Sequence, residues 1–194
     1  MSDLNADHET QASMNAWAVS AIPGSDVRIA IRAREELGEL MQVVNDKRPS
    51  TEEIIEKAVA ILVVFARLGT LLNTSLILTT CPESTIGKHK PHIPAMMALV
   101  QTRDFVDALV KQRLEGCSME GKLSGLIQEI WSLVQAVITR VDGDVQHAVD
   151  STMAKYRQRV WATDHDDGLT RHQRTGMPHH RGAESHHRGA LIGA

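Results

Sequence analysis

The stretch from Ala58 to Ala66 constrains the fold more than any other part of the sequence, because every residue in it is apolar. Ser50 or Thr51 can cap a helix ahead of it, and two glutamates follow this cap, where the helix dipole favours acidic side chains. We therefore predict a helix from this cap to about Leu72. A helix that is apolar around its whole circumference is buried among other elements, and this run is too short to span a bilayer.

Helical spacing of apolar residues recurs along most of the chain, and no segment alternates apolar and polar residues with a period of two. Further helices are predicted over residues 26–44, 95–114, 119–140 and about 144–161. Asp26 is the candidate cap of the first of these helices. The aromatic content of 3% fits helices packed through aliphatic side chains. The predicted fold class is all-α.

A weak internal repeat with an offset of 73 residues relates these helices. Residues 56–67 align with residues 129–140, and residues 34–40 align with residues 107–113. Two helical hairpins joined by a proline-bearing linker would form a four-helix bundle, although any two amphipathic helices would align about this well. The predicted organisation is an N-terminal segment (1–25), a first hairpin (26–72), a linker (73–94), a second helical half (95–161) and a disordered tail rich in His, Arg and Gly (162–194).

The charge and the cysteine content exclude several classes of protein. A net charge of −3 gives no positive field for nucleic acid or for an anionic membrane. The chain has two cysteines without a C-x-x-C pair, and no apolar run follows a basic start as it does in a secretion signal. We therefore expect a cytoplasmic protein with reduced thiols and with neither a nucleic-acid nor a membrane partner.

Three carboxylates stand close together in the first predicted helix. Glu36 and Glu39 are three positions apart and project from one helix face, and Glu35 and Glu39 are four apart. Such acids repel one another unless they are solvated or hold a cation, and hard divalent ions such as Mg²⁺ prefer oxygen ligands. The alternative is a solvated acidic face with Arg32 and Arg34 nearby.

A second acidic pair begins the next helix. Glu53 and Glu56 are again three positions apart, and thirteen residues lie between Glu39 and Glu53. Two antiparallel helices that each offer such a pair can build a cage of four carboxylates, as bundle cores do in carboxylate metal proteins.

The run from Glu35 to Leu40, followed by a short loop and an acidic-led apolar helix that ends in Phe65-Ala66-Arg67-Leu68, resembles the MazG-like, all-α nucleoside triphosphate pyrophosphohydrolases. The resemblance covers residues 26–72. It implies a homodimeric helical bundle that uses Mg²⁺, with Mn²⁺ as a substitute, to convert (deoxy)nucleoside triphosphates to monophosphates and pyrophosphate and so adjust the nucleotide pool. The metal ligands that it implies are Glu36, Glu39, Glu53 and Glu56, with Glu35 in the second shell or as the general base.

A basic segment near the C-terminus is similar to the tryptophan-ended segment that closes many phage and bacterial members of this superfamily. Lys155, Arg157, Arg159 and Trp161 are the residues concerned, and the resemblance implies that they bind the substrate. The alternative is a basic helix end that complements its own dipole.

The acidic motif departs from the family's pattern in its second half. Alignment on Ala66-Arg67-Leu68 places the family's second acidic pair near Lys57 and Ala60, or one residue earlier at Glu56 and Val59. The expected aspartate is missing in both placements, and only a shifted register that uses Glu53 and Glu56 recovers two carboxylates. In the second half of the repeat, Leu109 and Gln112 stand at the positions of Glu36 and Glu39. The alternative function is therefore a catalytically inactive MazG-like bundle that binds a nucleotide or another protein.

Overall fold

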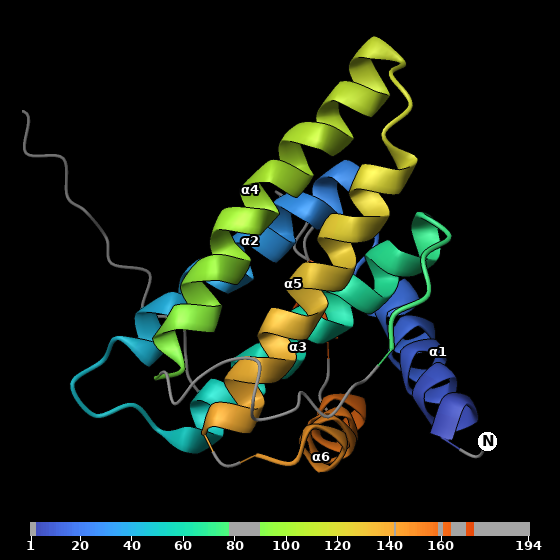
Figure 1. Cartoon of the computed structure of the whole chain (residues 1–194). Helices are drawn as coiled ribbons and strands as arrows, with labels where there is room; N and C mark the ends of the chain where they lie inside the picture. Colours follow the sequence, from blue (N-terminus) through green and yellow to red (C-terminus); the bar gives the residue numbers. More distant parts are fainter. Residues whose placement is uncertain (1–2, 78–89, 142, 159–160, 164–169, 173–194) are drawn as a thin grey trace, which may run out of the picture.

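The computed structural model describes residues 3–77, 90–141, 143–158, 161–163 and 170–172. The six helices are α1 (Asp3–Ala21), α2 (Asp26–Val44), α3 (Thr51–Leu71), α4 (His92–Glu115), α5 (Glu120–Arg140) and α6 (Val145–Gln158). They pack as a bundle, which confirms the predicted all-α class (Figure 1). No helix in the described part of the chain is long and apolar enough to cross a membrane.

Helix α3 lies at the centre of the bundle, as the apolar stretch from Ala58 to Ala66 predicts. Helices α1, α2, α5 and α6 all pack on it, so that side chains around most of its circumference are buried. Phe65 of α3 meets Phe105 of α4 edge-on, with 6.1 Å between the ring centroids. Burial of each large aliphatic or aromatic side chain contributes about 1.5–3 kcal/mol, so α3 supplies much of the stability of the bundle.

Helix α2 packs on α3 and α4, and α4 packs on α5, so two helical hairpins lie side by side (Figure 1). Ser25 caps α2: its backbone is extended and its Oγ accepts a hydrogen bond from the Arg28 amide. The prediction of Asp26 as the cap is wrong by one residue. Asp26 is the first helical residue, and its carboxylate instead accepts hydrogen bonds from the Val27 amide and from the guanidinium of Arg113 at the far end of α4.

Helix α1 lies in the N-terminal segment, where no helix is predicted. Its buried face carries Met14 and Ala18 rather than a stripe of large aliphatic residues, so it lacks an amphipathic signal. The buried Gln11 fixes α1 to the chain after α3: its Oε1 accepts from the Leu76 amide at 2.9 Å, and its Nε2 donates to the Thr74 carbonyl at 3.3 Å. These contacts are long-range, and the local pattern does not encode them.

The C-terminal end of the last helix differs from the prediction. Helix α6 ends at Gln158, and Trp161 lies in β1 (Trp161–Thr163), which pairs in antiparallel fashion with β2 (Thr170–His172). The prediction of helix as far as Trp161 is therefore wrong, because the helix ends at Gln158 and Trp161 begins a three-residue strand. Residues 164–169 and 173–194 of the predicted disordered tail lie outside the described residues.

Candidate functional site

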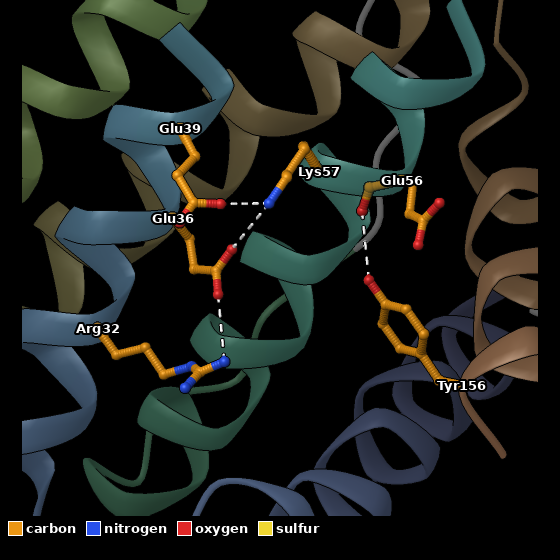
Figure 2. A network of polar contacts seen from close by, with 6 residues as sticks. All are labelled: Arg32, Glu36, Glu39, Glu56, Lys57 and Tyr156. Atoms are coloured by element: carbon orange, nitrogen blue, oxygen red, sulfur yellow. Dashed lines mark hydrogen bonds and ion pairs between the residues drawn. The ribbon is translucent and has the colours of Figure 1, made fainter. Parts of the chain in front are cut away.

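The packing of α2 against α3 brings the first predicted acidic pair to a lysine (Figure 2). The Nζ atom of Lys57 donates a hydrogen bond to Glu39 Oε2 and lies 3.9 Å from Glu36 Oε2. One turn earlier in α2, Arg32 Nη2 lies 3.3 Å from the other oxygen of Glu36. These contacts form one chain of alternating positive and negative side chains, in the order Arg32, Glu36, Lys57 and Glu39, which we call the ionic chain.

Burial and charge act in opposite directions on these groups. Burial raises the pKa of Glu36 above 4.5, and the positive charges of Arg32 and Lys57 offset only part of this effect. Burial alone would lower the pKa of Lys57, but the hydrogen bond to Glu39 and the neighbouring carboxylates together raise it above 10.5. The lysine is therefore held as an ammonium ion at neutral pH.

The second predicted acidic pair lies close to Lys57 in the sequence of α3, with Glu56 directly before it and Glu53 one turn earlier. Figure 2 shows the Glu56 side chain directed away from Glu39 and toward α6, where the Tyr156 hydroxyl donates to the Glu56 carbonyl oxygen at 3.4 Å. Glu53 is exposed in the first turn of α3, and its amide donates to the cap residue Ser50. The four glutamates therefore do not close into the predicted cage.

A cavity of about 310 Å³ lies between α1, α2, α3 and α6. Its lining residues are Trp17, Ala21, Ile22, Arg32, Glu36, Glu53, Glu56, Lys57, Ala60, Val63, Val64 and Tyr156. Trp17 and Tyr156 stack with 5.3 Å between their centroids and 25° between their planes. The cavity thus joins an aromatic pair and an aliphatic wall to the ionic chain of α2 and α3.

The residues at the predicted metal centre do not fit a divalent ion. Between Glu36 and Glu39, where the ion would bind, the ammonium group of Lys57 contacts both carboxylates. Among the described residues, no group of three or more His, Cys, Asp or Glu side chains could hold a metal ion. Glu35, the predicted second-shell residue or general base, is exposed on α2, and its charge helps to raise the pKa of Glu36.

The predicted substrate-binding residues do not line the cavity in the part of the chain that the structure describes. Lys155 Nζ lies 2.7 Å from Glu52 Oε1, an exposed contact that lowers the pKa of Glu52. Arg157 Nη2 donates to the Ser13 hydroxyl at 2.7 Å and so joins α6 to α1. Arg159 and the side chain of Trp161 lie outside the described residues.

Lys57, Trp17 and Tyr156 are among the lining residues that are absent from the predicted site. The signal for Lys57 is the alignment on Ala66-Arg67-Leu68, which places this lysine at the family's acidic position. The aromatic pair has no local signal, because Trp17 and Tyr156 lie at opposite ends of the bundle's sequence and meet only after α1 and α6 have packed on α3.

Comparison with known proteins does not place the chain in a family. A scan against protein-family models, a search of curated proteins and a search of solved structures each gave no match. The arguments about function below therefore rest on the cavity and on its lining residues.

Proposed function

We propose that this chain is a metal-independent helical module that binds a small organic molecule in the cavity between α1, α2, α3 and α6. The alternative predicted from the sequence is an inactive MazG-like bundle that binds a nucleotide or another protein; we keep this bundle, with α2 to α5 as its four-helix core, and change the class of ligand. The observation that carries the proposal is the position of the Lys57 ammonium between Glu36 and Glu39.

The ammonium group neutralises the carboxylates that a metal ion would need. A cation bound by Glu36 and Glu39 would approach Lys57 Nζ, which already lies 3.9 Å from Glu36 Oε2. At an effective dielectric constant of about 20, two unit charges about 4 Å apart repel by about 4 kcal/mol, and a divalent ion doubles this repulsion. The lysine therefore supplies the positive charge of this site and disfavours Mg²⁺ and Mn²⁺.

The cavity itself has the character of a small-molecule site. Ligand pockets are about 300–1,000 Å³ in volume and combine apolar walls with a few polar groups that orient the ligand. Here Val63, Val64 and Ala60 form an aliphatic wall, while Arg32 and Glu36 provide hydrogen-bonding groups. The volume of about 310 Å³ suits a ligand with a single ring system.

The second candidate function is the Mg²⁺-dependent hydrolysis of (deoxy)nucleoside triphosphates to monophosphates and pyrophosphate. One observation favours it: Glu36, Glu53 and Glu56, three of the four predicted ligands, line the same cavity. This function requires Lys57 to leave both Glu36 and Glu39, because its ammonium otherwise stands where the ion would bind.

The two candidates are separated by melting the protein in millimolar Mg²⁺ or Mn²⁺ and by assaying pyrophosphate release from a panel of nucleotides. We expect no metal-induced rise in the melting temperature of the wild type and no pyrophosphate. A metal bound at one hundred times its Kd would add about 2.7 kcal/mol to the free energy of unfolding, a shift that is easily measured. If the wild type shows such a shift and releases pyrophosphate, and Glu39→Gln abolishes both, the binding-module proposal is wrong.

A matched pair of variants tests the part played by the lysine. In Lys57→Met the carboxylates of Glu36 and Glu39 lose their ammonium, so Mn²⁺ should stabilise this variant more than it stabilises the wild type. Lys155→Met removes an exposed lysine whose ion pair lies outside the cavity, and it should respond to Mn²⁺ as the wild type does. An equal response of both variants would contradict the role assigned to Lys57.

A further inference from the structure

We propose that the cavity takes a small organic cation that carries one planar ring, the chemical class of an aromatic amine. This inference rests on the proposed function, since it names the class of ligand for the same cavity. Three properties of the lining support it: its charge, its aromatic pair and its size.

The charge of the lining favours a cation over an anion. Among the residues that the structure describes, the lining has three carboxylates, of Glu36, Glu53 and Glu56, and two cationic side chains, of Arg32 and Lys57. Both cationic side chains already contact carboxylates of α2. If Glu36 takes up a proton, the lining becomes neutral but still not positive. A phosphate group would therefore have to break existing ion pairs before it could be bound.

The aromatic pair lies beside the carboxylates of α3. Trp17 is half-buried, lines the cavity and stacks on Tyr156. Figure 2 shows Tyr156 next to Glu56, whose carbonyl oxygen accepts the tyrosine hydroxyl. Aromatic faces attract cations, and tryptophan does so most strongly, while a planar ring can also stack on such a face. A cavity lined by aromatic rings and carboxylates is complementary to a ligand in which an aromatic ring is joined to an ammonium group.

The size of the cavity limits the ligand. A volume of about 310 Å³ lies near the lower end of the range for ligand pockets. The aliphatic wall of Ile22, Ala60, Val63 and Val64 can cover a ring but offers no partner to further polar groups. A ring with a short charged side chain satisfies both conditions, whereas a nucleoside triphosphate satisfies neither.

Calorimetric titration of the full chain, without metal ions, tests the inference with three probes of matched shape. The probes are 2-phenylethylammonium, the neutral 2-phenylethanol and the anionic 3-phenylpropanoate. We expect the ammonium compound to bind at least tenfold more tightly than the alcohol, and the carboxylate to show no binding. Added salt should weaken the binding of the ammonium compound and leave that of the alcohol unchanged.

Variants locate the binding in the cavity. Glu56→Gln should weaken the binding of the ammonium compound severalfold and leave the binding of the alcohol unchanged. Ala60→Leu, which fills the cavity, should weaken the binding of both compounds. The matched control is Glu52→Gln, which changes an exposed glutamate that does not line the cavity and should alter neither affinity. Helix content and melting temperature show that each variant is folded.

Three outcomes would overturn the inference. The first is binding of the alcohol as tight as, or tighter than, that of the ammonium compound. The second is tighter binding of the carboxylate or of adenosine monophosphate than of the ammonium compound. The third is no binding of any probe. If adenosine monophosphate binds without metal and Ala60→Leu abolishes its binding, the class of ligand named here is wrong but the proposed function stands. A different result, the metal-dependent release of pyrophosphate, would contradict the proposed function.

Discussion

The two long helical hairpins of the bundle differ in what fills the contact between their helices. In the α2–α3 hairpin, Lys57 meets Glu36 and Glu39. The sequence repeat places Leu109 and Ile130 of the α4–α5 hairpin at the positions of Glu36 and Lys57, and both are fully buried. At these two positions, the first hairpin thus has an ion pair and the second has buried aliphatic side chains.

The residue of the second hairpin that aligns with Glu39 has a different role. Its counterpart Gln112 accepts a hydrogen bond from the Met119 amide at 3.1 Å and so stabilises the start of α5. Apolar packing stabilises a helix pair at no desolvation cost, whereas buried charges gain little net stability even when they are paired. At the positions of Leu109 and Ile130, apolar packing therefore stabilises a helix pair more than an ion pair does.

The largest expected effect on the free energy of unfolding comes from a lysine substituted in the second hairpin at the position equivalent to Lys57. Ile130→Lys would bury a charge in an apolar contact and should lower the free energy of unfolding by about 3–5 kcal/mol, the cost of an uncompensated buried charge. The matched control Ile130→Val should cost only about 0.5–1.5 kcal/mol. Urea denaturation of both variants measures the difference. Similar stabilities would show that the α4–α5 contact tolerates charge as the α2–α3 contact does.

The converse change removes the lysine from the first hairpin. Lys57→Met leaves the buried Glu36 without one of its two cationic partners and should cost about 1–3 kcal/mol. The double variant Lys57→Met/Glu36→Gln should recover most of this loss, because the carboxylate that then lacks its ammonium partner, that of Glu39, is exposed. Chemical denaturation of the single and double variants gives the coupling energy. Additive effects of the two substitutions would mean that Lys57 and Glu36 do not interact.

The pH dependence of stability distinguishes the two hairpins further. Because burial raises the pKa of Glu36 in the folded state, the folded protein binds this proton more tightly than the unfolded chain does. The contribution of Glu36 to stability is therefore fully present below pH 4.5 and falls as the pH rises toward its folded pKa. As the pH rises from 4.5 toward the folded pKa of Glu36, the free energy of unfolding of the wild type should fall relative to that of Glu36→Gln. The curve of Leu109→Val against pH should run parallel to that of the wild type. A wild-type curve parallel to that of Glu36→Gln would contradict the raised pKa.

The smallest expected effect compares one glycine from each hairpin. A Cβ atom added at Gly38 of α2 or at Gly125 of α5 would meet no atom within 4 Å. Alanine at either position should therefore stabilise its helix by about 0.5–1 kcal/mol. Thermal melting measures both changes. Destabilisation by Gly38→Ala alone would show that α2 does not tolerate a side chain at this position as α5 does at Gly125.

The sequence predicted the elements of this site better than their arrangement. The i, i+3 spacing of Glu36 and Glu39 fixes them on one face of α2, which needs only the local helix geometry. The same spacing in Glu53 and Glu56 suggested a cage of four carboxylates, but Glu56 points toward α6. The direction of a helix face depends on how the helix is rotated about its axis when it packs, and neighbouring residues do not encode that rotation.

The sequence by itself determined the all-α class, the bounds of α2, the burial of α3 and a cap of α3 at Ser50 or Thr51, of which the structure has Ser50. Each of these follows from interactions within about four residues or from the period of the apolar pattern. Only the tertiary structure decided that Lys57 meets the acidic pair, that Gln11 secures α1, and that Trp17 stacks on Tyr156. Those contacts join residues far apart in the chain, and they form only when apolar burial has already set the packing of the helices.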